Sequence, residues 1–160
     1  MTDKDQQQTN KAVARAFVAG FNAGDIDALE QLLADDFVWH TAVIGDEETQ
    51  PRPFQSAQLA GMENSIYGPL LKNRSQTRAL FEVLFGSAQT TGYGFGLHIV
   101  SLIAEGDRVA MEVEGSAVNP ANGRHYRNLY CVLMLMCDAK IVRYKEYQDT
   151  LHIYDVFVAE

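Results

Sequence analysis

The chain has 160 residues, of which 47% are hydrophobic and 21% are charged. This length fits a single domain over residues 1–160. The composition excludes an intrinsically disordered chain, because it supplies enough apolar surface for a core. The 13 Lys and Arg against 21 Asp and Glu give a formal net charge of −8. An acidic balance of this size disfavours binding to nucleic-acid phosphates or to an anionic membrane surface.

Neither the first residues nor the cysteines indicate secretion or a membrane anchor. Residues 1–9 are polar and lack the apolar core of a signal peptide, so we expect a flexible leader there. No apolar run approaches the roughly 20 residues of a membrane-spanning helix. On one strand, Cys131 and Cys137 would lie about 20 Å apart, too far for a disulfide. We therefore expect a cytoplasmic protein.

Two helices are predicted first along the chain. Residues 11–23 place apolar side chains at helical spacing and stop before Gly24. Asp25 is a typical N-cap for a second helix, which we expect to end at the Asp35–Asp36 pair. The segment 37–43 is rich in β-formers and predicts a strand.

The middle of the chain changes pattern twice. Residues 44–72 are a long stretch of Gly, Pro and acidic residues without periodicity, which we interpret as a long loop or lid. Helical spacing resumes over 74–88. Beyond Gly92 the apolar period becomes two, and turn residues separate four predicted strands, over 97–103, 108–118, 125–136 and 141–148. Helices followed by strands predict an α+β fold with the helices on one face of an antiparallel sheet.

The common catalytic motifs are absent from the sequence. It has no Gly-rich phosphate loop, no GxSxG and no HExxH. Its four histidines are scattered, at His40, His98, His125 and His152. We therefore expect neither a metal site nor a cofactor, and the strands become the place to look for chemistry.

Glu146 on the last predicted strand is the most informative residue. Arg143 and Lys145 share one face of that strand, which we expect to be in water, so Tyr144, Glu146 and Gln148 point toward the helices. A carboxylate on a helix-covered face is costly unless it is hydrogen-bonded or its pKa is raised. The alternative is an edge position at which the carboxylate reaches solvent or pairs with an arginine.

The preceding strand offers polar groups that share a face. It is apolar in both registers, so both of its faces are expected to be covered. Asn128 and Tyr130 share one register and supply either pocket donors or structural hydrogen bonds near the start of the strand. On the strand before, Gly115 predicts room for a ligand or a β-bulge. Trp39 on the first strand is either core or a pocket wall.

Three segments carry a resemblance to a known superfamily: "FVAGFNAGDIDALEQLLADDFVWH", "LIAEGDRVAMEVEG" and "YRNLYCVLMLMCDAKIVRYKEYQDT". The pattern resembles the nuclear-transport-factor-2-like superfamily, and within it the SnoaL-like branch of polyketide cyclases and ketosteroid isomerase-like proteins. The resemblance implies a cone-shaped barrel, in which a curved antiparallel sheet wraps around the N-terminal helices. It does not fix the reaction, because such folds host many chemistries.

The resemblance also allows the residues of this sequence to be compared with the catalytic residues of two enzymes of the superfamily. Where ketosteroid isomerase has its base, oxyanion-hole acid and helix tyrosine, this sequence has Thr41, Val132 and Phe17. Where limonene epoxide hydrolase has an Asp-Arg-Asp set, it matches only the last position, with Glu146. Neither mechanism is therefore expected here.

We expect a cofactor-independent enzyme that transfers protons on a small apolar or aromatic substrate, as a lyase, an isomerase or a cyclase. Glu146 would be the general acid or base, and Tyr130 and Asn128 would donate hydrogen bonds to a developing oxyanion. The predicted substrate-binding residues are Trp39, Thr41, Tyr67, Leu80, Met111, Tyr144 and Gln148.

Two other classes of function fit the same sequence. A small-molecule carrier would have the same pocket, with Glu146 as an anchor only. A protein-interaction module would use the outer face of the sheet and keep a filled interior. An open cavity that Glu146 faces would disfavour the interaction module.

The outer face predicts a homodimer. On the strand over 125–136 the outward set is apolar, and we expect it to form one patch with Val100 on a neighbouring strand, which a second copy would cover. The alternative is that the C-terminal tail, 151–160, folds over this face. The outward set consists of Leu129, Cys131, Leu133 and Leu135.

Overall fold

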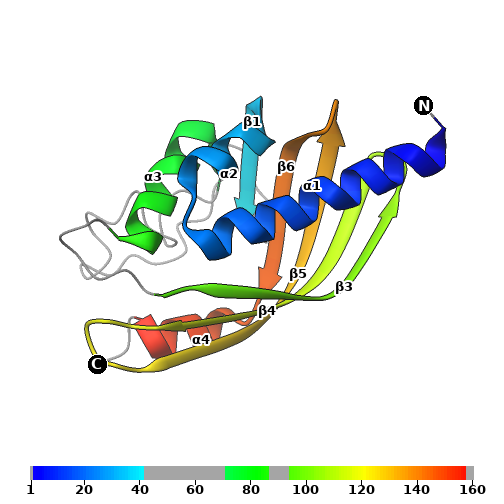
Figure 1. The fold of residues 1–160 in the computed structure, drawn as a ribbon. Helices are drawn as coiled ribbons and strands as arrows, with labels where there is room; N and C mark the ends of the chain where they lie inside the picture. The colour runs from blue at the N-terminus through cyan, green and yellow to red at the C-terminus, as the bar shows by residue number, and fades with distance from the viewer. Residues whose placement is uncertain (1, 42–70, 87–93, 158–160) are drawn as a thin grey trace.

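The computed structural model describes residues 2–41, 71–86 and 94–157 (Figure 1). The helices are α1 (Asp3–Ala23), α2 (Ile26–Leu32), α3 (Arg74–Phe85) and α4 (Thr150–Phe157). The strands are β1 (Leu33–Thr41), β2 (Leu71–Asn73), β3 (Gly96–Glu105), β4 (Arg108–Val118), β5 (His125–Cys137) and β6 (Lys140–Gln148). They form one sheet in the order β2-β1-β6-β5-β4-β3. All neighbours are antiparallel except β1 and β6, which are parallel.

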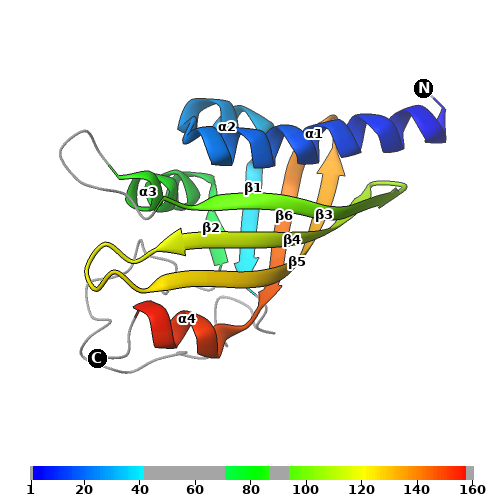
Figure 2. The ribbon, with the colours of Figure 1, turned by 60° about the horizontal axis from the view of Figure 1, so that its bottom comes forward.

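The sheet is strongly curved, and the helices lie on its concave side. Figures 1 and 2 show α1 crossing in front of the sheet, with α2 and α3 at one end and α4 beside the far ends of β4 and β5. The predicted α+β cone fold is therefore confirmed. The exception to a purely antiparallel sheet is the β1–β6 pair, which closes the sheet beside the first helices.

The first helix begins earlier than the sequence predicts. Thr2 caps it: the Thr2 hydroxyl accepts from the Asp5 amide at 3.2 Å, and the Asp5 carboxylate accepts from the Thr2 amide at 3.0 Å. This capping box satisfies two amides at the helix N-terminus. Further along, the buried Asn10 side chain donates to the Gly106 carbonyl at 3.0 Å. The prediction of a flexible leader is wrong for residues 2–9, because local capping and a tertiary hydrogen bond order them.

The junction of α2 and β1 also differs from the prediction. Asp25 caps α2 as expected, its carboxylate accepting from the Ala28 amide at 3.0 Å. The helix stops at Leu32, and Leu33 already pairs with Ile141 of β6. Leu33 is buried in this pairing, so the gain from burying it against β6 ends the helix before the two aspartates.

Strand β2 lies at the end of the predicted loop 44–72. Its three residues pair with β1, and Asn73 then caps α3 by accepting from the Gln76 amide at 3.0 Å. The end of this loop is therefore part of the sheet. The remainder of the candidate lid, including Tyr67, lies outside the described residues.

On β4 burial alternates as the sequence predicts, with the inward residues buried and Glu112 and Glu114 exposed. Burial alternates on β5 too, so the expectation that both of its faces are covered is not met within one chain. The concave face meets an aromatic core supplied by α1 and α3. Trp39 and Tyr144 lie 4.5 Å apart between ring centroids, and Phe17 packs on Tyr144 at 5.3 Å. This core seals the base of the cone.

The C-terminal helix packs inside the cone, away from the outer face of the sheet. Ile153 and Val156 of α4 form a cluster with Ala117 and Tyr126 of the concave face. The alternative in which the tail covers the outer face is therefore wrong for the residues that α4 contains. On that face Leu129 is 61% exposed and Leu133 is 40% exposed.

Two further expectations bear on location. Cys131 and Cys137 both lie on β5 as exposed, free thiols. Among the described helices, none is long and apolar enough to cross a membrane. The cytoplasmic location itself stays a prediction.

Candidate active site

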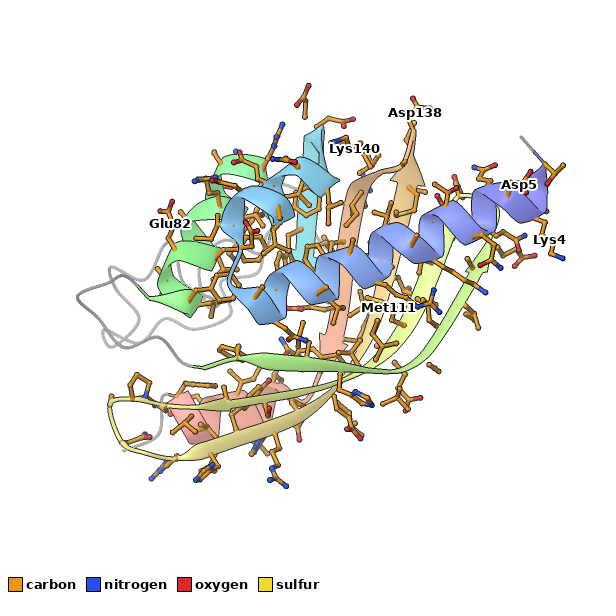
Figure 3. The ribbon with its side chains drawn as sticks, viewed as in Figure 1. Lys4, Asp5, Glu82, Met111, Asp138 and Lys140 are labelled. Carbon is orange, nitrogen blue, oxygen red and sulfur yellow. The ribbon has the colours of Figure 1, made fainter. Side chains whose placement is uncertain are left out.

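A cavity opens between the helices and the concave face of the sheet. Its volume, counted as space open to the centres of water molecules, is about 60 Å³, whereas one water needs roughly 10–15 Å³ by that measure. Most of the lining is apolar; Figure 3 shows one such residue, Met111, between α1 and the sheet. The polar side chains that line it are Lys72, Tyr126, Tyr130, Tyr144, Glu146 and Gln148.

Strand register explains why these groups meet. Residues directly opposite on neighbouring strands point to the same face. One such row runs Lys72, Trp39 and Tyr144 across β2, β1 and β6. One step further along, Glu146 faces Val132 on β5, and a step beyond that Gln148 faces Tyr130. The register therefore turns polar side chains of β2, β5 and β6 toward the same cavity.

Glu146 sits among these groups with a dehydrated carboxyl. Burial raises its pKa to about 7, against the smaller opposing effects of a hydrogen bond from the Trp39 side chain and the charge of Lys72. Gln148 Nε2 also donates to Glu146 Oε1, at 3.4 Å. Glu146 keeps some accessible surface because it faces the cavity, but the crowded walls remove most of its water. A carboxyl of this kind exchanges its proton near neutral pH.

Lys72 is a polar cavity residue that the sequence analysis missed. Its side chain is buried, with 2% of its surface exposed. Burial lowers its pKa to about 8, partly offset by the charge of Glu146. The only signal in the sequence was its place before the Asn73 cap. A three-residue strand is too short to display a period, so nothing marked this lysine as facing inward.

The tyrosines form a hydrogen-bonded chain along the cavity wall. Tyr126 Oη and Tyr130 Oη are 2.5 Å apart, and Tyr126 Oη donates to Gln148 Oε1 at 3.3 Å. Burial raises the pKa of Tyr126 to about 12. Burial, followed by the nearby Tyr126 and Glu146, raises the pKa of Tyr130 well above its usual range. Both phenols therefore remain protonated at neutral pH. Because Tyr126 gives its single hydroxyl hydrogen to Gln148, Tyr130 is the donor in its contact with Tyr126.

Asn128 lies behind this chain and is not among the residues that line the cavity. Its Nδ2 donates to Tyr126 Oη at 2.9 Å and to the Asp149 carbonyl at 3.0 Å. Its Oδ1 accepts from the Asp149 amide at 3.3 Å. Because its amide hydrogens are engaged, Asn128 is placed to hold Tyr126, and Tyr130 alone of the two expected donors reaches the cavity.

Gly115 provides space for a side chain of the protein itself. A Cβ added there would lie 2.5 Å from Tyr130 Cε2, closer than real contacts allow. The predicted room for a ligand or bulge is therefore filled by the Tyr130 ring. The absence of a side chain at Gly115 is what lets this ring lie flat on β4.

The structure brings together most of the expected binding residues. Thr41 pairs with Glu146 through the strand register, but its side chain, like all of Tyr67, lies outside what is described. Within the described residues, no three His, Cys, Asp or Glu side chains gather as metal ligands. The expected residues that line the cavity are Trp39, Leu80, Met111, Tyr130, Tyr144, Glu146 and Gln148.

Comparison with protein-family models gives a match to the SnoaL-like domain over residues 14–144. The chain belongs to this family. The match includes α2, α3 and strands β1 to β5, and it ends within β6 at Tyr144. Comparison with curated protein sequences finds no significant match.

Solved structures with the same fold are distant in sequence. A putative SnoaL-like polyketide cyclase from Jannaschia sp. CCS1 has a TM-score of 0.69 at 13% identity, covering 96% of this chain and 94% of its own. An LEH-like epoxide hydrolase from M. tuberculosis has a TM-score of 0.66 at 15% identity, and the match covers 95% of this chain and 91% of its own. A putative ketosteroid isomerase from Kribbella flavida has a TM-score of 0.59 at 14% identity, and the match covers 89% of this chain and 78% of its own. At these identities the likeness establishes the fold alone.

Proposed function

We propose that this protein is an enzyme that transfers protons on a small, largely apolar or aromatic substrate, with Glu146 as general acid and base. The observation that carries the proposal is the dehydrated carboxyl of Glu146, with a pKa of about 7, facing an apolar cavity. A group that titrates near the working pH is populated in both protonation states, which is what general acid–base catalysis needs.

The neighbouring groups fit this role. Tyr130 remains protonated beside the cavity, and its hydroxyl would turn from Tyr126 to donate to an oxyanion that develops as the proton moves. Gln148 and Trp39 donate to the carboxyl and would hold it in one orientation. The apolar wall, with Leu80 and Met111, would exclude water from the reacting atoms.

The class of reaction is an isomerase, a cyclase or a lyase. The structural neighbours described as a polyketide cyclase and a ketosteroid isomerase favour this range. Epoxide hydrolysis is disfavoured despite the epoxide hydrolase neighbour. Val113 and Gly115 stand where the resemblance places the arginine and the second aspartate of that reaction.

A small-molecule carrier is the alternative that the cavity leaves open, whereas a protein-interaction module with a filled interior is disfavoured by the cavity itself. We would incubate the protein with a panel of aromatic and terpenoid metabolites and follow binding and turnover separately. Turnover that Glu146→Gln abolishes supports the enzyme. Binding with no turnover by the wild-type protein supports the carrier.

We also propose that two copies pair through the convex face of the sheet. Val100 does not join the apolar row of β5 as expected, because β4 lies between the two strands and presents Glu112 and Glu114 there. The β5 row is thus flanked by Arg108, Glu112 and Glu114 of β4 and by the basic residues Arg143 and Lys145 of β6.

Both signs of charge therefore border the apolar row, because Arg108 lies opposite Leu135 and Glu112 lies opposite Cys131. A stable dimer buries about 800 Å² per partner.

Sedimentation at micromolar concentration should give twice the mass of one chain. Leu133→Glu should give a single chain, and Val83→Glu, on an exposed residue of α3, should not. A wild-type protein that sediments as a single chain would reject the dimer.

A further inference from the structure

Lys72 is a buried lysine that the proposed proton transfer does not use. It lines the cavity from β2, directly across the strands from Trp39, and only 2% of its surface is exposed. Burying an amine in a largely apolar cavity is costly, and an apolar side chain would build the same wall more cheaply. We therefore infer that the Lys72 amine interacts with the molecule that the cavity binds.

We propose that Lys72 is a nucleophile that forms an imine with an aldehyde or ketone bound in the cavity. The proposal deepens the proposed function and rests on it, because Glu146 would move the protons around that imine. It rests on geometry first: an amine and a carboxyl face the same small cavity, from neighbouring rows of the sheet. It assigns carbonyl compounds as the substrate class.

The chemistry balances without any oxidant or further reactant. The Nζ lone pair of Lys72 attacks the carbonyl carbon, and a proton moves from nitrogen to oxygen to give a carbinolamine. The Glu146 carboxylic acid protonates the hydroxyl, water leaves, and the C=N⁺ bond forms. The resulting Glu146 carboxylate then removes the proton next to the iminium carbon to give an enamine. Reprotonation at carbon and addition of one water return the carbonyl product and the free amine.

The surroundings of Lys72 supply the neutral amine that this step requires. Since burial lowers its pKa to about 8, roughly one tenth of it is neutral at pH 7, against well under a thousandth of an ordinary lysine. The apolar walls also favour the loss of charge in the attacking group. The competing role for Lys72 is a fixed positive charge that only pairs with Glu146, and that role does not require reactivity toward carbonyls.

The test is reductive trapping in the intact protein. We would incubate the wild-type protein with benzaldehyde and sodium cyanoborohydride at pH 7 and locate benzylated lysines by peptide mass spectrometry. Lys4 and Lys140 are internal controls, because both are exposed on the outside of the molecule (Figure 3). We expect Lys72 to be labelled at least about tenfold faster than either control. Labelling of Lys72 no faster than the controls would overturn the proposal.

Two variants separate this inference from the proposed function. Lys72→Met removes the amine but keeps a long apolar side chain, and should lose the fast label. Glu146→Gln should slow the label at Lys72 without abolishing it, because Lys72 still attacks the carbonyl while Glu146 no longer assists the loss of water. Turnover that depends on Glu146 with no fast label at Lys72 overturns the imine alone. A fast label at Lys72 with turnover unaffected by Glu146→Gln supports the amine and overturns Glu146 as the acid–base group.

Discussion

On strands β5 and β6, neighbouring residues along the chain point to opposite faces of the sheet and meet opposite surroundings. Glu146 faces the cavity, where burial raises the pKa of its carboxyl to about 7. Tyr147, the next residue, is exposed on the convex face, in the same cross-strand row as Cys131 and Glu112. The convex face presents charges to water. The concave face removes water from a few polar groups, and this dehydration shifts their pKa values.

The largest expected effect comes from exchanging the carboxyl on the concave face. Glu146→Gln keeps the shape of the side chain and removes its proton exchange, so turnover should fall by about 10²–10⁴-fold. The melting temperature at pH 7 should stay within a few degrees, because removing a dehydrated carboxylate favours folding while losing its attraction for Lys72 opposes it. Glu112→Gln, the matched change on exposed β4, should leave turnover unchanged. Activity of Glu146→Gln within about threefold of wild type would remove Glu146 from the mechanism.

The substitution Tyr130→Phe should have the next largest effect on turnover. It deletes the hydroxyl that is 2.5 Å from Tyr126 Oη and beside the cavity. If the phenol stabilises an oxyanion, turnover should fall by about 10²–10³-fold with little change in substrate affinity, because such donors act chiefly in the transition state. Steady-state kinetics and equilibrium binding measure the two effects separately. Weaker binding with unchanged turnover would favour the carrier.

The pH dependence of stability contrasts the two buried ionisable groups. Glu146 has a pKa of about 7 when folded and near 4.5 in the unfolded chain. Between these values the folded protein binds more protons, so stability falls as pH rises through that window. Lys72 has a pKa of about 8 against 10.5, so the folded protein binds fewer protons and stability rises from about pH 8 to 10.5. Each contribution is at most about 3 kcal/mol.

Chemical denaturation across this pH range measures both contributions. Glu146→Gln should remove the fall in unfolding free energy between about pH 4.5 and 7, and Lys72→Met should remove its rise above about pH 8. A wild-type curve with the same shape as both variants would show that neither group is dehydrated in the folded state.

The smallest expected effect concerns how the wall of the cavity is built. Gly115→Ala places a methyl group 2.5 Å from the Tyr130 ring, so the ring must shift, at a cost of about 1–3 kcal/mol in unfolding free energy. Gly96→Ala is the matched control, because its Cβ would lie 3.5 Å from Ser116 Oγ, an ordinary contact. Thermal denaturation compares the two. Equal stability of both variants would mean that the ring does not need the space at Gly115.

Much of the fold was readable from the sequence, because long elements repeat their pattern. The period-two alternation of β4 and β6 predicted which side chains face inward, and through it the inward position of Glu146. The N-cap at Asp25 was readable for the same reason: a short polar side chain before a periodic run is a local signal. These features depend on neighbours within a few residues, which the sequence displays directly.

What only the tertiary structure decided involves partners that are distant along the chain. Leu33 leaves its helix because it is buried against Ile141. Asn128 turns away from the cavity because Tyr126 and Asp149 take its hydrogen bonds. Lys72 joins Glu146 because a three-residue strand pairs with β1. Local propensity has no access to such pairings, since the free energy that fixes them comes from burial and hydrogen bonding between segments that meet only in the folded chain.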